Sequence, residues 1–596
     1  MLEAVKRLGE LKLKREKKSN LSILLDDPNK DGNCPKVLVA DFETTEGGLR
    51  YSKISIEDFS KDKVELYLYK RKASRGPDYT LTSKITEVEK FFSNKIESWL
   101  KEHSNETSIF EELKKSIEKD KQKIKEDLIS SYSKLKSTLK KDQVCLYTIR
   151  IDSKYIGEID EFKNLIMKLA KDSFSKVVKE DHICCICGKK KSEVFGEALS
   201  DVFKFYTLDK PGYIAGGFNE ELAWRNAPIC FDCLLYLREG KKYLDDFLKW
   251  KMGGNQYYLI PKFIFEIKET ENIIDAFFGY TSRPQETLQN KAIERITEDE
   301  KEILQILGGF GDLLTYNFLF FESDNPQVFK INLLIEDVLP SRVNKIFKVK
   351  KDVENHQIFK NVEIRKNKYE NIIFSFDLFK QFIPSKKQFL ELVNQIFLGR
   401  SANSRIIFSC FINKIREEFL KEKSSYIDIL TLQAFLCLLF LKKLGILNEE
   451  KTNKNEGGVF MDDLRKEMET FFDEYENTFL TPVHKAVFLL GVLAKKLMII
   501  QLKERGGTPF YKNFKGLRLE EEDFKSLLPK IINKLEEYNK NYYSNLEELI
   551  SIYFLEAGSG WKISNEELNF YFVLGMSLCK KISEILKMEK EEQKDE

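Results

Sequence analysis

The sequence predicts an α+β protein of several domains. The chain has 596 residues, which is long enough for three or four domains with sizeable cores. Short β-branched apolar runs alternate with helical segments in the first half, whereas residues 377–596 have a helical period almost throughout. Two Cys-x-x-Cys pairs, Cys184/Cys187 and Cys230/Cys233, precede the helical part. We therefore expect an α/β N-terminal part, a zinc-bound four-cysteine insertion, a mixed middle region and a C-terminal α-helical bundle.

These patterns divide the chain into four predicted domains. They are an N-terminal α/β domain at 1–180, a zinc-binding module at 181–245, a mixed α/β middle region at 246–376 and a C-terminal helical bundle at 377–596. The boundaries rest on the change from strand-like to helical periodicity and on the position of the cysteine pairs.

The composition indicates a soluble globular protein, with 42% hydrophobic and 33% charged residues. Because 98 basic and 96 acidic residues leave a net charge of only +2, any contact with nucleic acid must come from local basic patches. The most apolar runs, 434–441 and 486–493, are too short to cross a bilayer. Residues 1–18 lack the apolar core of a signal peptide. We therefore expect a cytoplasmic protein with reduced thiols and no membrane partner.

Local patterns predict the elements of the N-terminal domain. Residues 1–18 place apolar side chains on one face of an amphipathic helix, and Lys36–Ala40 reads as a strand. The alternating segment Val64–Tyr69 is expected to be a strand that pairs with it or near it. Residues 83–141 have a helical period, high charge and no Gly or Pro, and their second half predicts a long solvated helix or a helical hairpin. Val144–Ile151 returns to strand character.

Further strands and a repeated helical motif follow the cysteine pairs. Tyr257–Ile267 reads as a strand, and Leu314–Ile335 reads as a β-hairpin with a Ser-Asp-Asn-Pro turn between its arms. In the helical part, Phe488-Leu-Leu-Gly491 and Phe572-Val-Leu-Gly575 echo each other, and a Lys-Lys pair follows each. A glycine inside a helix costs roughly 1 kcal/mol relative to alanine. These glycines therefore indicate a close helix–helix crossing rather than a ligand loop.

The two cysteine pairs predict a tetrahedral metal site, for which zinc is the usual occupant. The Cys-x-x-Cys spacing lets both thiolates of a pair turn toward one ion, and Gly188 frees the chain to curl away after the first pair. Buried reduced thiols, or a single redox pair, are the alternatives. His182 and Cys185 are candidate substitute ligands.

A second motif, Asp41-Phe-Glu43, follows an apolar run. Some exonucleases present two carboxylates to divalent metals in this way. The chemistry also needs an acidic residue in a His-x3-Asp or Tyr-x3-Asp frame, which the sequence lacks. No Gly-x4-Gly-Lys-Ser/Thr phosphate loop occurs, and none of the four histidines precedes an aspartate. A strand end is the favoured interpretation of the motif, and a metal-dependent nuclease is the alternative.

The order of motifs from about residue 181 onward resembles that of a known family. After the first cysteine pair come Thr207-Leu-Asp-Lys-Pro-Gly212, Gly216-Gly-Phe218 and Trp224-Arg-Asn-Ala-Pro-Ile-Cys-x-x-Cys233. Phe320-Phe-Glu, Ile335-Glu-Asp-Val-Leu-Pro-Ser-Arg342 and the two Phe-x-Leu-Gly helices follow. Together they resemble the large subunit of the type I-B CRISPR effector complex, Cascade.

This resemblance implies a subunit that is not an enzyme. Such subunits associate with crRNA and the Cascade backbone subunits, help to recognise the protospacer-adjacent motif on double-stranded target DNA, and dock the helicase–nuclease that degrades it. Because guide pairing reads most of the target, the protein contacts only a few base pairs and phosphates. The expected nucleic-acid contacts are Lys189, Lys190, Lys191, Lys210, Arg225, Arg400 and Arg405. A solvated surface charge is the alternative for each, and the zinc is expected to be a structural staple rather than a reader of bases.

The resemblance also implies a second product of the same gene. In type I-B systems the C-terminal helical part of the large subunit can be made separately, as a small subunit, from an internal start. The codons for Glu456-Gly-Gly458 can encode a ribosome-binding sequence just upstream of Met461. We therefore expect a product covering Met461–Glu596, with a simple interhelical linker as the alternative interpretation. A zinc-stabilised scaffold of another complex is the remaining alternative for the whole chain.

Overall fold

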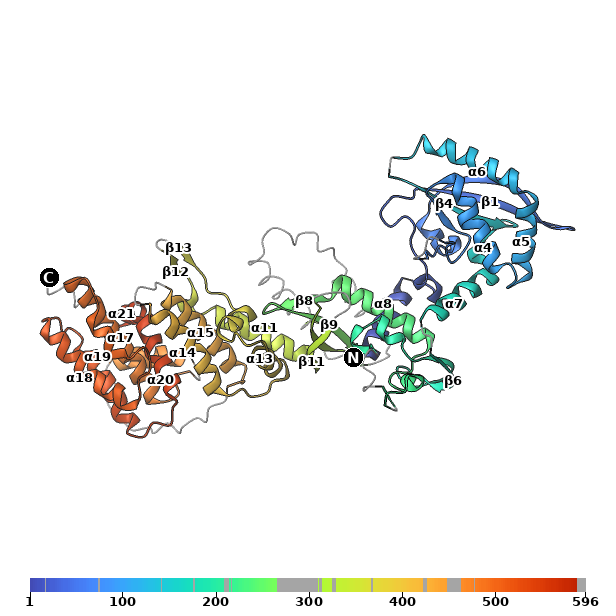
Figure 1. Ribbon diagram of the computed structural model, residues 1–596. Coiled ribbons are helices and arrows are strands. Elements are labelled where there is room, and N and C mark those ends of the chain that lie inside the picture. Colours follow the sequence, from blue (N-terminus) through green and yellow to red (C-terminus); the bar gives the residue numbers. More distant parts are fainter. Residues whose placement is uncertain are drawn as a thin grey trace. The chain divides into compact units, whose positions relative to one another are not determined.

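A computed structural model gives the fold of the chain (Figure 1). It describes residues 1–264, 309, 314–447 and 463–586, apart from gaps at 17, 73–75, 141, 175–176, 208–213, 216, 324–328, 366–367, 422–425 and 476–477. The chain forms two compact units, one built mainly from Met1–Leu248 and the other mainly from Lys249 onward. Every helix within the described ranges is too short or too polar to span a membrane. The division into four domains stays a prediction.

The first unit contains a mixed β-sheet, drawn in blue in Figure 1. Its central strand β1 (Lys36–Thr45) pairs antiparallel with β2 (Gly48–Asp58) and parallel with β4 (Cys145–Ile151). The short strands β3 (Ser83–Ile85) and β5 (Lys154–Tyr155) both pair antiparallel with β4. The strands expected at 36–40 and 144–151 are confirmed, and the apolar run of β1 is buried in the core.

Helices cover one side of this sheet. α5 (Ser108–Lys119) and α6 (Lys121–Lys136) pack against β2, and the Tyr51 hydroxyl on β2 donates a hydrogen bond to Asp127 on α6 at 2.7 Å. The charged stretch, expected to be a long solvated helix or a helical hairpin, therefore forms two consecutive helices that break at Asp120 and pack on the sheet. The remaining helical segments here are α3 (Val88–Phe91), a π-helical turn (Phe92–Glu97), α4 (Ser98–His103) and α7 (Asp160–Phe174).

The strand expected at Val64–Tyr69 is wrong. The chain instead forms the short helix α2 (Val64–Tyr67), which ends at Leu68 with a left-handed φ of 55°. The carbonyl oxygen of Tyr67 accepts a hydrogen bond from the Thr82 hydroxyl, and the Tyr67 ring is buried against the sheet. Partners distant in sequence therefore satisfy the backbone and bury the aromatic ring, which overrides the local alternation.

The amphipathic helix α1 (Leu2–Arg15) packs along α8 (Phe231–Phe247), the helix that contains the second cysteine pair's last residue. The backbones touch at two glycines. A Cβ atom on Gly9 would overlap a carbonyl oxygen of α8, and one on Gly240 would overlap a carbonyl oxygen of α1. The first helix of the chain therefore belongs structurally to the cysteine-containing module.

The second unit begins with a four-stranded sheet in the order β11-β10-β9-β8. The strands are β8 (Lys249–Met252), β9 (Asn255–Phe263), β10 (Leu314–Glu322) and β11 (Lys330–Val338). Strand formation around Tyr257 and over the two arms of the expected hairpin is therefore confirmed. The Asp-Asn-Pro part of its turn lies outside the described residues.

Where the structure describes the rest of the second unit, the regular elements are helices and one small hairpin, β12 (Val362–Arg365) and β13 (Lys368–Glu370). This confirms the helical C-terminal region. Helix α20 packs against α14, α15 and α17. The helices are α11 (Pro340–Glu354), α12 (Phe376–Phe382), α13 (Lys386–Leu398), α14 (Ser404–Phe419), α15 (Ile427–Lys443), α16 (Asp463–Glu474), α17 (Pro482–Arg505), α18 (Glu521–Glu537), α19 (Ser544–Ala557), α20 (Asn565–Ser577) and α21 (Cys579–Ile585).

The two Phe-x-Leu-Gly motifs meet where α17 crosses α20. A Cβ atom on Gly491 would overlap the carbonyl oxygen of Phe572, and one on Gly575 would overlap the carbonyl oxygen of Phe488. Each glycine therefore contacts the backbone of the other motif directly. The close helix–helix crossing expected from the sequence is confirmed.

Candidate metal centre and its basic surroundings

The four paired cysteines converge on one point. Their sulfur atoms all lie within 4.8 Å of one another; Cys184, Cys230 and Cys233 are buried, whereas Cys187 is half-buried. A tetrahedral zinc site with bonds of about 2.3 Å places its sulfurs roughly 3.8 Å apart. The four sulfur atoms would therefore need to move only slightly closer together to bind one ion. Among the described residues, no other group of three or more Cys, His, Asp or Glu side chains lies close enough together to hold a metal.

Each Cys-x-x-Cys pair with its turn is here called a knuckle. The first knuckle, which contains Cys184 and Cys187, joins two antiparallel strands, β6 (Val178–Ile183) and β7 (Lys190–Phe195). The Gly188 N–H donates to the Cys184 carbonyl oxygen at 2.9 Å, and Gly188 has a φ of +66°, which favours glycine. The Ile186 N–H donates to the Cys184 sulfur at 3.4 Å. The turn therefore closes around Cys184, as expected from the position of the glycine.

The second knuckle is fixed by a bridge to β7 and by the start of α8. Phe195 and Ile229 exchange two backbone hydrogen bonds, at 2.8 and 3.1 Å. The next residue, Cys230, is the N-cap of α8, and Cys233 lies in the first turn of that helix. The Cys230 N–H donates to the Cys184 sulfur at 3.3 Å. Backbone pairing therefore contributes to bringing the two knuckles together.

The electrostatics of the cluster are those of thiols that share protons. Hydrogen bonds from the thiols of Cys230 and Cys233 lower the pKa of Cys184 far below its ordinary value. The hydrogen bond to Cys184 raises the pKa of Cys230 to about 11 and also raises the pKa of Cys233. A bound divalent metal would displace the shared protons and take thiolate ligands. This donor set suits zinc, because thiolates prefer softer metals to magnesium or calcium.

The two substitute ligands lie outside the cluster. The His182 ring packs on the Trp224 ring, with 4.3 Å between centroids. Cys185 is exposed, and its N–H donates to the Pro228 carbonyl oxygen at 2.7 Å. The geometry therefore assembles the four residues of the two Cys-x-x-Cys pairs alone.

The lysines beside the first knuckle lie on its exposed side. Lys189 and Lys190 are exposed, and the Lys190 ammonium lies 3.8 Å from the Asp181 carboxylate. Lys191 is half-buried and lies 3.3 Å from Asp232 on α8. Two of the three expected nucleic-acid contacts therefore have an acidic neighbour.

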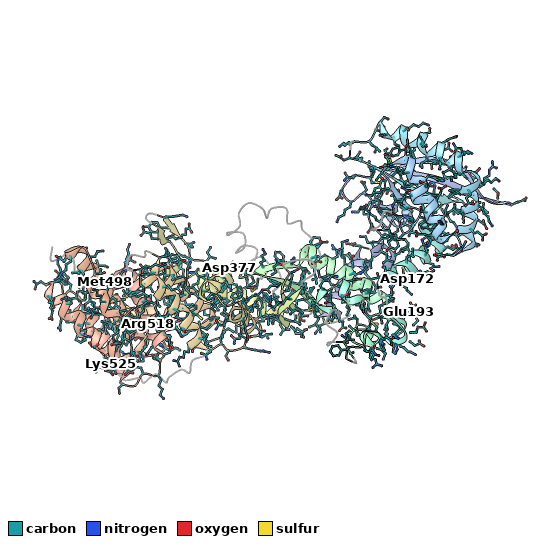
Figure 2. The ribbon with its side chains drawn as sticks, viewed as in Figure 1. Asp172, Glu193, Asp377, Met498, Arg518 and Lys525 are labelled. Atoms are coloured by element: carbon teal, nitrogen blue, oxygen red, sulfur yellow. The ribbon has the colours of Figure 1, made fainter. Side chains whose placement is uncertain are left out.

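Further acidic groups make this surface mixed in charge. Glu193 on β7, labelled in Figure 2, accepts a hydrogen bond from Lys171 of α7 at 2.7 Å. A contact with nucleic acid would therefore depend on a few well-placed cations, because no broad positive field surrounds the knuckle.

The other four expected contacts are dispersed. Arg225 is exposed in the cysteine module, with its guanidinium carbon 5.6 Å from the centre of the Trp224 ring. Arg400 and Arg405 are exposed in the second unit, at the connection between α13 and α14, and Arg405 lies 3.9 Å from a Glu566 carboxylate oxygen. Lys210 lies outside the described residues.

The Asp-x-Glu motif is part of a charged network. Asp41 accepts two hydrogen bonds from the Arg150 guanidinium, at 2.8 and 3.2 Å, and one from Ser55 at 3.0 Å. Arg150 also donates to Glu57 at 2.8 Å. Glu43 is exposed farther along β1. The Asp41 carboxylate therefore already has a cationic partner where a nuclease would place a metal.

Comparison with protein-family models covers the chain almost from end to end. Models described as CRISPR-associated protein TM1802 match in three parts: its N-terminal domain over residues 1–168, its central domain over 181–338 and its C-terminal domain over 370–593. Among proteins with curated functions, none matches the chain in sequence. The order of the three matches confirms the resemblance to the type I-B large subunit. The chain belongs to the TM1802 family of type I-B CRISPR-associated proteins.

Proposed function

We propose that the chain is the non-catalytic large subunit of a type I-B Cascade and works in the cytoplasm. The observation that carries this proposal is the ordered match of all three TM1802 domain models along one chain. In this role the chain binds crRNA and the backbone subunits, contributes to recognition of the protospacer-adjacent motif on double-stranded DNA, and recruits the helicase–nuclease.

The charge distribution supports a subunit that holds nucleic acid within a larger assembly. The net charge of +2 provides no strong overall attraction for a polyanion. Exposed cations are nevertheless present beside the first knuckle and on the α13–α14 connection. Local contacts of this kind suit a protein that leaves most sequence reading to guide pairing.

We assign the proposed zinc a structural role. Four cysteine ligands would complete a tetrahedral zinc site and leave no position for substrate or water. The cluster would fasten the β6–β7 turn to the start of α8, and α8 in turn supports α1. Zinc would therefore stabilise the shape of the module, and the surrounding side chains would make the contacts with partners.

Purification of the complex tests the proposal. The tagged chain is expected to co-purify with crRNA and repeated backbone subunits, and this complex is expected to bind duplex DNA that contains the matching target and its adjacent motif. A chain that purifies alone from cells expressing the complete system would contradict the proposal. Replacing Lys189, Lys190 and Lys191 with alanine is expected to weaken DNA binding and to flatten its salt dependence. The same change at Lys530, Lys534 and Lys540 is the matched control.

The non-catalytic part of the proposal has its own test. Since Arg150 occupies the Asp41 carboxylate, we expect the purified chain to leave DNA and RNA intact with magnesium or manganese present. Nuclease activity that is present in the wild type and lost in Asp41→Ala would instead establish the metal-dependent nuclease.

A further inference from the structure

The planar side chains of His182, Trp224 and Arg225 in the cysteine module lie close together, and they are here named the Trp224 cluster. His182 packs on the indole of Trp224 with 4.3 Å between ring centroids and 34° between ring planes. The Arg225 guanidinium carbon lies 5.6 Å from the centre of the same indole. Such a distance allows a cation–π interaction. Arg225 is exposed, whereas His182 and Trp224 are half-buried, so the cluster extends from the module to its surface.

The backbone around Trp224 is closely constrained. A Cβ atom on Gly196 would overlap the Cα and Cβ atoms of Trp224, so the chain can pass here only because residue 196 is glycine. The Gly196 N–H donates to the Val177 carbonyl oxygen at 2.9 Å, which fixes the glycine itself. The Asn226 side chain accepts a hydrogen bond from the Ala215 N–H at 2.6 Å. The backbone at Trp224 is therefore closely packed, and a segment that is ordered before binding loses less entropy when a ligand arrives.

The same hairpin carries cations next to the cluster. His182 on β6 lies directly opposite Lys191 on β7 in the strand register. The two preceding residues, Lys189 and Lys190, are exposed. The hairpin therefore carries flexible ammonium groups and the His182 ring, and Trp224 and Arg225 are joined to it through the contact of Trp224 with His182. Proteins combine these two kinds of group to bind single-stranded nucleic acid, in which bases stack and phosphates contact cations.

The state of Arg225 favours a ligand over a purely structural role. Its side chain is exposed, has no ion-pair partner among the described residues, and lies with its guanidinium carbon near the face of the indole. A guanidinium that rests on an aromatic ring can offer its own plane to a base. Lysine has the same charge but no such plane, so the two side chains can be distinguished by experiment.

We propose that the Trp224 cluster is a stacking platform for an unpaired nucleobase of single-stranded nucleic acid. Arg225 contacts the base, Trp224 and His182 hold the guanidinium in position, and Lys189 and Lys190 contact the flanking phosphates. The platform rests on the proposed function of the chain within Cascade, and it adds a ligand class and a site to that function. An opened DNA strand and a crRNA both supply the required chemistry.

The test measures binding of the full-length, zinc-loaded chain to fluorescent 12-nucleotide DNA and RNA of the same sequence, over a series of salt concentrations. Arg225→Lys is expected to weaken binding about fivefold or more, because stacking is lost while the charge remains. Its salt dependence is expected to match that of the wild type. Lys189→Ala is expected to reduce the salt slope by about one. Arg518→Lys, at an exposed arginine labelled in Figure 2, is the matched control.

Two results would overturn the platform. One is wild-type binding by Arg225→Lys, which would show that the plane of the guanidinium is not used. The other is normal oligonucleotide binding by Arg225→Ala together with loss of complex assembly, which would make this surface a protein contact. Equal zinc content and helix content in each variant verify that the module is folded. Preference for DNA or for RNA supports the platform in either case and identifies the strand that occupies it.

The platform and the proposed function can fail separately. If Arg225→Lys binds oligonucleotides normally while the chain still co-purifies with crRNA and backbone subunits, only the platform is wrong. If oligonucleotide binding depends on Arg225 but no such complex exists, the platform stands and the Cascade assignment falls.

Discussion

Cys184 makes hydrogen bonds to both knuckles. Its sulfur accepts backbone hydrogen bonds from Ile186 in its own turn and from Cys230 in the other knuckle. Hydrogen bonds from the Cys230 and Cys233 thiols also lower its pKa. Hydrogen bonds to a sulfur favour its thiolate form, which is the form that would bind a metal.

Replacing this ligand is expected to empty the site. We predict that Cys184→Ser reduces bound zinc, measured by atomic emission on the purified chain, from about one ion to almost none. The free energy of unfolding of the first unit should fall by about 3 kcal/mol or more, because metal-binding energy contributes to folding. Cys185→Ser is the matched control, since Cys185 is exposed and outside the cluster. Full zinc content in Cys184→Ser would contradict a four-cysteine site.

At this scale the sequence predicted the ligands but not their neighbours. The Cys-x-x-Cys spacing is local, so the four ligands could be identified without knowing the fold. His182 was a reasonable ligand candidate for the same reason, because it lies two residues before Cys184. Its actual partner, Trp224, is brought to it by the long connection between the knuckles and by the space at Gly196. Nothing in local spacing reveals such a contact.

At the scale of elements, the close crossing of α17 and α20 requires glycine at two single positions. Gly491 and Gly575 each lie against the carbonyl oxygen of a phenylalanine in the opposite helix. Helices that approach this closely bury their backbones as well as their side chains, and any Cβ at the crossing forces them apart. The two helices also form much of the core of the C-terminal bundle.

We predict that Gly491→Ala destabilises the second unit by about 3 kcal/mol, although alanine favours helix formation, because overpacking outweighs helix propensity. Thermal or urea unfolding followed by circular dichroism measures the change. Gly507→Ala is the matched control, since a Cβ there would meet open space and its φ is not positive. Similar losses in both variants would show that the crossing is not the cause.

Prediction from the sequence succeeded for elements whose pattern is strong and failed where distant contacts decide. The helical C-terminal region has a long, consistent period, and the central strands contain β-branched apolar runs that are buried in the core. Val64–Tyr69 alternates over only six residues, and the burial of Tyr67 together with its bond to Thr82 gives a helical turn instead. The Gly9–Gly240 crossing of α1 and α8 could not be predicted either, because each glycine alone reads as a weak point in a helix.

On the scale of the whole molecule, the C-terminal helices α16–α21 are not covered entirely by one another. Phe570 on α20 packs against Phe408 and Phe411 of α14, with ring centroids 5.5 and 6.0 Å apart. Tyr511 stacks on Phe419 of the same helix at 4.2 Å. A separate product that begins at Met461 would lack α14 and would expose this aromatic surface. Met461 itself lies outside the described residues.

We predict that the complete complex contains such a product, Met461–Glu596, and that partner subunits cover its aromatic surface. Intact-mass spectrometry of purified complex is expected to detect it in the wild type. Met461→Leu, encoded by CUC, should remove it and leave the full-length chain, because CUC is a poor start codon. Met498→Leu, at a half-buried methionine of α17 labelled in Figure 2, should leave the product unchanged. A short subunit with the same first residue in Met461→Leu would refute internal initiation.

The packing of α1 on α8 also sets an order of events during translation. Helix α1 is made before α8, which is complete only roughly 230 residues later, and at 5–20 residues per second this is a delay of about 12–46 s. A lone helix of this length is marginally stable in water. Its apolar face, which includes Val5 and Leu8, lacks its packing partner α8 until then. We therefore expect the apolar face of α1 to be accessible to chaperones during this interval, and slow codons before α8 to prolong the exposure.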